Sequence, residues 1–304
     1  MALTCRRSGT RFAGCLRSLA VFTATLVLCS CSPRHIIVQG IGNELASQAG
    51  APEDDLQLAR ESAAFYLKLS ESILREEPGN LRLAEAVAGG FTQYAYAFVA
   101  FEAERIEAKD TRAAQKMRAR AARLYARARD HAMAALERSA PGFGGALANS
   151  DPARWPHISD KQVGVAYWAA ASWGGLISLS KDDPDVVADL PLAIRLAGIA
   201  SAKSPDFGEG ALASLMGTFE ASRPGGSTAR AVEFFDRATL AGANRNAGVF
   251  VARAEAIALP AGDRAGFEAL LRQALVVATS RRDLQNAVMR ERAQWLLDTA
   301  DDLF

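Results

Sequence analysis

The sequence has few residues of the kinds that form covalent cross-links or metal sites. No cysteine occurs after Cys31, and the only three histidines are His35, His131 and His157. Disulfides and the cysteine–histidine spacings of zinc sites are therefore excluded after residue 31. A body of this length can bury enough apolar surface to fold without disulfides. We expect no bound metal and no other cofactor.

An excess of charge of either sign is also missing. The formal net charge is +1, and residues 1–30 carry four arginines and no acid, so their removal would leave a charge of −3. A slightly acidic body offers no electrostatic attraction for a phosphate backbone. We therefore expect no nucleic acid among the partners.

Catalytic motifs are missing as well. Ser172 lies in the segment Ala170–Gly174, which superficially resembles a nucleophile elbow, but an elbow needs a preceding strand and this segment lies within a helical pattern. The glycines after Pro141 lack the Lys-Ser/Thr of a phosphate loop and indicate a helix end and a turn. The acidic run Lys181–Asp185 lacks the glycine and distant glutamate of a calcium loop. His131 fits a helix face, and we expect a protein that is not an enzyme.

The first 31 residues have the pattern of an export signal. Arginines and no acid precede an apolar run, Leu19–Leu28, that is too short to span a bilayer. The string Leu28-Cys29-Ser30-Cys31 resembles a lipobox, the processing site of bacterial lipoproteins. It predicts that Cys31 becomes the lipidated first residue, whereas an ordinary signal peptide or an uncleaved anchor are the alternatives. Ser32 after the cysteine favours the outer membrane over the inner membrane.

These features divide the chain into three regions. Residues 1–30 form the predicted lipoprotein signal peptide. Residues 31–52 form the lipidated N-terminus and a flexible tether, which contains Gly40, Gly42, Gly50 and Pro52. A short strand at 35–38 is an open alternative within it. Residues 53–304 form the body, which we expect to face the periplasm.

The body has the hydrophobic periodicity of helices throughout. Leu56, Ala59, Ala63, Tyr66 and Ile73 follow the three-and-four spacing of one helix face, and Pro78-Gly79 ends that pattern. No segment alternates with the period of a strand. The pattern predicts an all-α body with helices at 53–76, 81–106, 112–139, 158–181, 186–203, 208–221, 228–241, 247–258, 263–279 and 282–303.

The predicted helices form pairs that repeat. Pro78, Pro141 and Pro205 end helices at intervals of 63 and 64 residues, and Ala200, Ala238 and Ala274 recur 38 and 36 residues apart. Tetratricopeptide (TPR) units have a period of about 34 residues with small residues where the helices pack. We predict a TPR-like helical-repeat array of antiparallel helix pairs, with about ten or more helices and a concave binding surface. A generic helical array is the alternative.

Aromatic residues gather in two of these helices. Tyr94 lies in the segment Phe91–Phe101, and Tyr167, Trp168 and Trp173 lie close together in the helix at 158–181. Most such residues pack in a core, but tyrosine and tryptophan also suit half-wet apolar surfaces. We name Tyr94, Tyr167, Trp168 and Trp173 as the candidate surface for a ligand or partner.

Several strings in a fixed order resemble one family over residues 55–304. They are Leu124–Asp130, Pro141–Phe143, Tyr167–Gly174, Ile177–Asp182, Asp189–Pro191, Arg292–Leu297 and the terminal Asp301–Phe304. Together with the lipobox they resemble the TPR lipoproteins associated with TRAP transporters, the T component often called TatT. No single string is decisive, and the order makes the resemblance specific.

The resemblance implies a function that the residues alone do not. Its members are periplasmic, lipid-anchored accessory proteins that associate with a DctP-type solute-binding protein, the P subunit. They form homotrimers with a pore through each subunit, and the proposed task is to pass a hydrophobic or carboxylate ligand. A general TPR scaffold lipoprotein for outer-membrane or envelope assembly is the alternative.

Overall fold

The computed structural model describes residues 41–44, 46, 54–281 and 283–304. Within these ranges the chain forms helices and no strand, which confirms the all-α prediction. The α-helices are α3 (Leu56–Glu76), α4 (Leu81–Ala95), α5 (Phe101–Ile106), α6 (Thr111–Ser139), α7 (Phe143–Ala148), α8 (Asp160–Leu179), α9 (Pro184–Ala188), α10 (Leu190–Lys203), α11 (Ala211–Ser222), α12 (Thr228–Ala241), α13 (Ala247–Arg253), α14 (Arg264–Ser280), α15 (Leu284–Asp298) and α16 (Ala300–Leu303).

Short polar side chains begin most of these helices. The carboxylate of Asp55 accepts from the backbone N–H groups of Gln57 and Leu58, and the side chains of Asn80 and Asp110 cap α4 and α6 in the same way. Each cap satisfies donors that a helix leaves unpaired in its first turn. The local sequence therefore sets the helix starts, which lie within three residues of the predicted positions for these three helices.

The helix pattern departs from the prediction at several places. The expected helix at 81–106 contains a π-helical segment, η1 (Tyr96–Ala100), and the one at 247–258 ends in another, η3 (Ala254–Ala258). The glycines after Pro141 do end α6, but Phe143 then begins the short helix α7, and a 3₁₀ turn, η2 (Pro152–Arg154), follows. Hydrophobic periodicity did not predict these because they are too short to establish a period.

The first half of the body packs around its largest core. Side chains of α3, α4, α6, α8 and α10 share one buried cluster, in which Leu83, Leu136 and Leu196 have no exposed surface. Alanines allow the helices to approach closely, and a β-carbon at Gly89 would lie 2.7 Å from the indole of Trp168. The pattern of small residues facing large ones fixes how α4 and α8 pack.

An ion cluster also joins α3 to α6. Glu71 is 2% exposed and accepts hydrogen bonds from Lys68, Arg127 and His131. The Nε of Arg127 lies 2.5 Å from one carboxylate oxygen, and Nε2 of His131 lies 2.8 Å from the same oxygen. Although burial alone would raise the pKa of Glu71, these donors lower it to about 2. The cluster keeps a carboxylate charged within the interior.

The second half repeats smaller helix pairs around two further cores. Phe235 and Leu271 have no exposed surface, and neither do the periodic alanines Ala238 and Ala274. Ala200, the first of these alanines, is equally buried in the first core. These alanines lie where the period predicts close helix contacts. Their burial is consistent with a repeating helical array.

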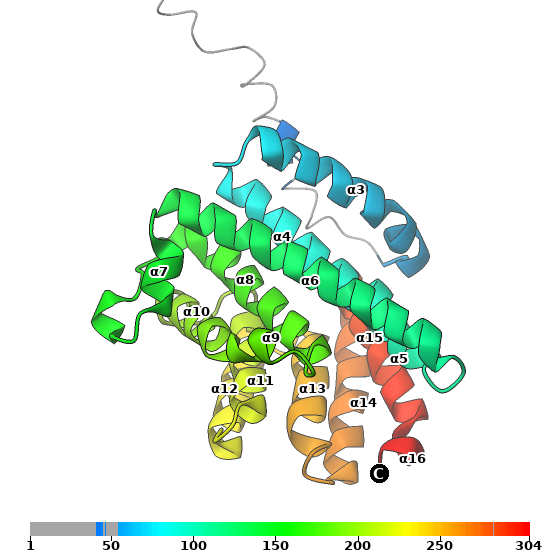
Figure 1. Ribbon diagram of the computed structural model, residues 1–304. Coiled ribbons are helices and arrows are strands. Elements are labelled where there is room, and N and C mark those ends of the chain that lie inside the picture. Colours follow the sequence, from blue (N-terminus) through cyan, green and yellow to red (C-terminus); the bar gives the residue numbers. More distant parts are fainter. Residues whose placement is uncertain (1–40, 45, 47–53, 282) are drawn as a thin grey trace, which may run out of the picture. The chain divides into compact units, whose positions relative to one another are not determined.

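The helices pack in sequence and then return to the start. Each of α3, α4, α6, α8, α10, α11, α12, α13, α14 and α15 contacts the next, and α15 also contacts α3. Figure 1 shows α15, in red, beside α14 and α5. The described helices of residues 54–304 therefore form a closed circuit of contacts.

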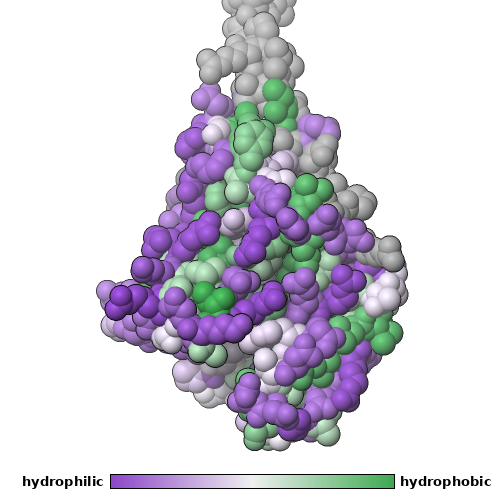
Figure 2. Space-filling model, turned by 90° about the vertical axis from the view of Figure 1, so that its right-hand side faces the viewer, coloured by the Kyte–Doolittle hydropathy of each residue, from purple (hydrophilic) through white to green (hydrophobic). Residues whose placement is uncertain are grey.

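The surface carries apolar residues in separated areas. On the face that Figure 2 shows, hydrophobic patches alternate with hydrophilic ones. Among the described residues, the most exposed large apolar side chains are Phe65 on α3, Leu240 on α12 and Val276 on α14. Among the described helices, none has an apolar stretch long enough to cross a membrane.

The predicted export signal and most of the predicted tether lie outside the described residues. Within the tether region, residues 41–44 and 46 are helical. Asn80 at the start of α4 donates a hydrogen bond of 3.1 Å to Asn43.

Candidate functional site

The closure of the helix circuit brings together residues that are far apart in the sequence. The rings of Phe101 on α5 and Trp295 on α15 meet edge to face at 5.6 Å. Beside them Arg105 and Glu291 lie 3.7 Å apart, and Arg292 reaches Glu104 across a separation of 188 residues. We refer to Arg292, Glu104, Glu255, Tyr96 and Tyr125 as the closure cluster.

Arg292 is the centre of the closure cluster. Its Nη1 donates to Glu104 and its Nη2 to Glu255, each at 2.5 Å. The guanidinium lies 5.0 Å from the ring centre of Phe101 and 5.1 Å from that of Trp295. The residue is 7% exposed, and its buried Nε has no hydrogen-bond partner among the described residues. A buried N–H without an acceptor costs free energy and marks a place where an acceptor can bind.

The two π-helical segments supply two members of the cluster. Tyr96 opens η1, and Glu255 lies in η3. A π-helical turn inserts an extra residue into a helix and is found frequently at functional sites. In this body both π-helical segments therefore contribute a side chain to the closure cluster.

Burial and charge shift the pKa values of the whole cluster. Burial would lower the pKa of Arg292, but the nearby carboxylates outweigh it and raise that pKa. Burial raises the pKa of Glu104 even though Arg292 opposes the shift. Burial also raises the pKa values of Tyr96 and Tyr125, so both phenols stay protonated donors at neutral pH.

Tyr125 owes its position to a glycine. A β-carbon at Gly175 on α8 would lie 2.7 Å from the ring of Tyr125 on α6. Tyr96, Glu104 and Arg292 all act on the pKa of the Tyr125 hydroxyl, which places that hydroxyl within their electrostatic range. The closure cluster therefore draws residues from α5, α6, α15 and both π-helical segments.

Two of the four aromatic residues predicted from the sequence contact each other. Tyr167 and Trp168 are half-buried on α8 with ring centres 4.7 Å apart, and Tyr167 also meets Phe207 at 5.3 Å. Burial raises the pKa of Tyr167 to about 12. These rings pack against the first core, and a role in binding stays a prediction.

The other predicted residues lie apart from that pair. Trp173 is 6% exposed, and its indole N–H donates to Asp189 at 3.2 Å. Tyr94 is half-buried, with the ring of Phe98 at 5.5 Å and the guanidinium of Arg120 at 5.9 Å. The described ring contacts do not join either residue to Tyr167 or Trp168. Cys31 lies outside the described residues, so its lipidation stays a prediction.

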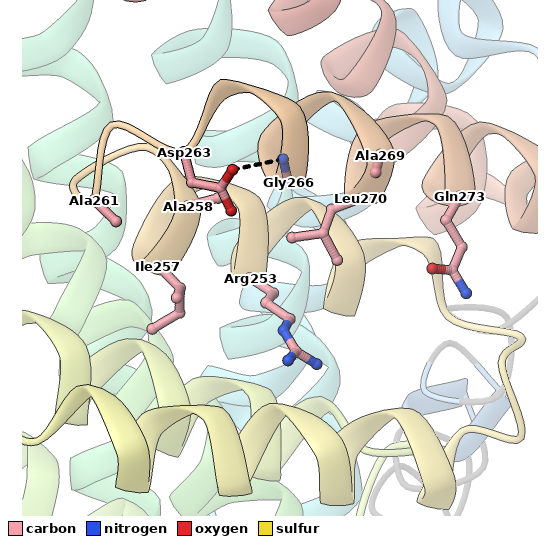
Figure 3. Close-up of a pocket in the computed structure, with 9 residues that line it drawn as sticks. All are labelled: Arg253, Ile257, Ala258, Ala261, Asp263, Gly266, Ala269, Leu270 and Gln273. Atoms are coloured by element: carbon pink, nitrogen blue, oxygen red, sulfur yellow. Dashed lines mark hydrogen bonds between the residues drawn. The ribbon is translucent and has the colours of Figure 1, made fainter.

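A shallow groove runs between α12 and α14. It consists of two adjoining hollows of about 370 Å³ each, which share Arg253, Leu270 and Gln273. Figure 3 shows Arg253 extending from α13 into the first hollow, and its guanidinium donates to Asp236 on α12 at 2.7 Å. Leu240, which is 79% exposed, lies in the second hollow. The groove was not predicted from the sequence, because its lining comes from α12, α13, η3, α14 and the turn after η3, which share no motif.

Residues that could suggest enzyme chemistry have other roles. Ser172 lies within α8, where its hydroxyl donates to the carbonyl groups of Trp168 and Ala169. Asp183 caps α9 through Asp185 and Val186. Among the described residues no group of three histidine, cysteine, aspartate or glutamate side chains is placed to hold a metal ion.

Comparison with known proteins covers the whole body. The family model of the TRAP transporter T-component matches residues 52–304. An uncharacterized protein of Treponema pallidum (strain Nichols) is 24% identical over 309 residues, which span 93% of this chain and 96% of that protein. The chain therefore belongs to the TRAP transporter T-component family, which is a family of accessory transport components rather than enzymes.

Proposed function

We propose that this protein is a lipid-anchored, periplasm-facing accessory subunit that binds the extracytoplasmic solute-binding protein of a TRAP system. The observation that carries the proposal is the family match, which extends over residues 52–304 and thus over every described helix from α3 to α16. The lipobox-like string before Cys31 supports the anchor, with the outer membrane as the favoured location. Several acyl chains on one residue hold a protein to a membrane firmly.

The proposal also gives the body a part in handling the solute. A closed circuit of helices supports a passage through each subunit, and the half-buried aromatic rings of Tyr167 and Trp168 suit a hydrophobic or carboxylate solute. A homotrimer would place several such subunits against the binding protein. The TPR-like character supports this role because stacked helix pairs offer a broad surface to a protein partner.

Recovery of the partner tests the central claim. Residues 32–304 carrying an affinity tag are used to capture proteins from a periplasmic extract of the source cells, with the tag fused to an unrelated periplasmic protein as the control. We expect a DctP-type solute-binding protein only with the tagged body. Recovery of envelope-assembly proteins without any solute-binding protein would overturn the proposal.

The anchor is tested separately in the full chain. Cys31→Ala should release the protein from membranes into the soluble fraction. Cys29→Ala should leave it attached, because processing needs a small residue directly before the lipidated cysteine, and Cys29 follows the large Leu28. Detergent phase partitioning measures both variants. Retention of Cys31→Ala in the detergent phase would contradict the predicted lipidation.

A further inference from the structure

The closure cluster has hydrogen-bond donors that no described residue satisfies. The buried Nε of Arg292 lacks an acceptor, and neither the hydroxyl of Tyr96 nor that of Tyr125 bonds to another residue in the described part of the chain. A carboxylate offers about four lone-pair sites on two oxygens, which is enough for three donors. The free donors of the cluster therefore match one carboxylate group.

The same cluster has free acceptors beside these donors. Glu104 and Glu255 each use one oxygen on Arg292, and the second oxygen of each accepts no hydrogen bond from the residues that the structure describes. Their side chains are 38% and 29% exposed, so solvent reaches both carboxylates. An ammonium group carries three donors and no acceptor, which fits such a pair of oxygens.

The charges of the cluster indicate that neither a carboxylate nor an ammonium group fits it alone. Two carboxylates around one guanidinium leave one negative charge unbalanced. Arg118, which also acts on Glu104, already forms an ion pair with Glu107. A lone carboxylate would thus meet a net repulsive charge, and a lone ammonium would leave the donors of Arg292 and the tyrosines unused.

We propose that the closure cluster binds the polar end of a small zwitterionic solute, one that carries both an ammonium and a carboxylate group. The carboxylate accepts from Arg292 Nε and from the hydroxyls of Tyr96 and Tyr125. The ammonium donates to the free oxygens of Glu104 and Glu255. This inference rests on the proposed function, since it names the class of solute that the accessory subunit handles. At the closure cluster, that solute is zwitterionic and not a simple carboxylate.

The rings of Phe101 and Trp295 hold the guanidinium in place. Both stack against Arg292 at about the distance of cation–π contacts, so the side chain is fixed before a solute arrives. A fixed guanidinium loses little conformational freedom on binding, which favours affinity. Neither ring is required to touch the solute.

Three probes with the same six-carbon chain test the proposal on purified residues 32–304, which comprise the tether and the body. They are norleucine, hexanoate and hexylamine, and calorimetry at pH 7 measures their affinities. We expect norleucine to bind at least about tenfold more tightly than either of the other two, which corresponds to one charged hydrogen-bonded contact. Equal binding of all three probes, tighter binding of hexanoate, or no binding of any probe would overturn the proposal.

Substitutions place the binding at this cluster. Tyr96→Phe should lower the affinity for norleucine by about tenfold, because one hydrogen-bond donor to its carboxylate is lost. Glu255→Gln should lower the affinity for norleucine and raise the affinity for hexanoate, because it removes the unbalanced negative charge. Glu291→Gln, next to Arg292 but outside the cluster, is the matched control and should change neither affinity. A change of ligand preference in Glu255→Gln is a result that simple loss of folding does not produce, and unchanged preference would contradict the site.

The outcomes separate this inference from the proposed function. If the solute-binding protein is captured and norleucine does not bind, the inference fails and the accessory role stands. If norleucine binds and no solute-binding protein is captured, the site stands and the accessory role fails.

Discussion

Glu71 and Arg292 are both buried ionic groups that join distant helices, but their surroundings differ. Glu71 lies among the hydrogen-bond donors of Lys68, Arg127 and His131, and both of its oxygens accept hydrogen bonds. Arg292 lies between two carboxylates and keeps an unpartnered Nε. The first cluster has used its hydrogen-bonding capacity, whereas the second has capacity left. This difference separates an ion cluster that stabilises the fold from one that can also take a solute.

The largest expected effect is the loss of the Glu71 cluster. Glu71→Met removes the shared hydrogen-bond partner of Lys68, Arg127 and His131 and should lower the free energy of unfolding by about 3 kcal/mol. Denaturant unfolding measures it. Glu61→Met, at an exposed position of the same helix, is the matched control and should change stability by less than about 0.5 kcal/mol. Equal losses of unfolding free energy in Glu71→Met and Glu61→Met would show that the Glu71 cluster does not stabilise the fold.

The pH dependence of stability gives the same cluster a second signature. The pKa of Glu71 is about 2 in the folded state and 4.5 ordinarily, so the folded state binds fewer protons between these values. Its contribution of about 3 kcal/mol is fully present above pH 4.5 and is lost as the pH falls toward 2. Thermal unfolding of the wild type and Glu71→Gln should therefore converge over this window. A difference that stays constant from pH 7 to pH 2 would show that the charge of Glu71 is not responsible.

A glycine tests how the second cluster is assembled. Gly175→Ala places a methyl group against the ring of Tyr125 and should cost about 2 kcal/mol of stability. Gly198→Ala on α10 is the matched control, because no atom lies near its β-carbon position, and it should stabilise the helix by about 0.5 kcal/mol. Denaturant unfolding distinguishes the two, and a neutral Gly175→Ala would mean that Tyr125 can move freely.

The smallest expected effect is the loss of Arg292 itself. Arg292→Met should cost about 1 kcal/mol, less than Glu71→Met, because the carboxylates of Glu104 and Glu255 are partly exposed and regain water. The same denaturant measurement on both methionine variants provides the comparison. A larger loss of stability for Arg292→Met than for Glu71→Met would reverse this order and show that the closure cluster stabilises the body more than the Glu71 cluster does.

Much of the fold follows from local sequence, and the closure cluster does not. Hydrophobic periodicity predicted the long helices, and the structure shows that the side chains of Asp55, Asn80 and Asp110 cap three of them; both signals act within a few residues. The contact between Arg292 and Glu104 spans 188 residues and depends on the sum of every turn between them. No pattern near either residue marks it.

The aromatic prediction shows a different limit. The sequence predicted correctly that Tyr167 and Trp168 lie on one helix, but composition does not distinguish a core ring from a binding ring. Trp173 is almost completely buried, while Tyr96, in the same aromatic segment as Tyr94, belongs to the closure cluster. A π-helical segment at Tyr96 changes the face on which the following side chains lie, and periodicity of 3.6 residues does not anticipate it.

The return of α15 to α3 has a consequence for how the body unfolds. An open repeat array frays from its ends, and its stability adds up from neighbouring units. In this body the last long helix is tied to the first, so fraying at either helix must first break the shared contacts. We expect a single cooperative transition in place of stepwise loss of repeats. The same tie fixes the number of repeats, because adding or removing one helix pair would move α15 out of reach of its partner.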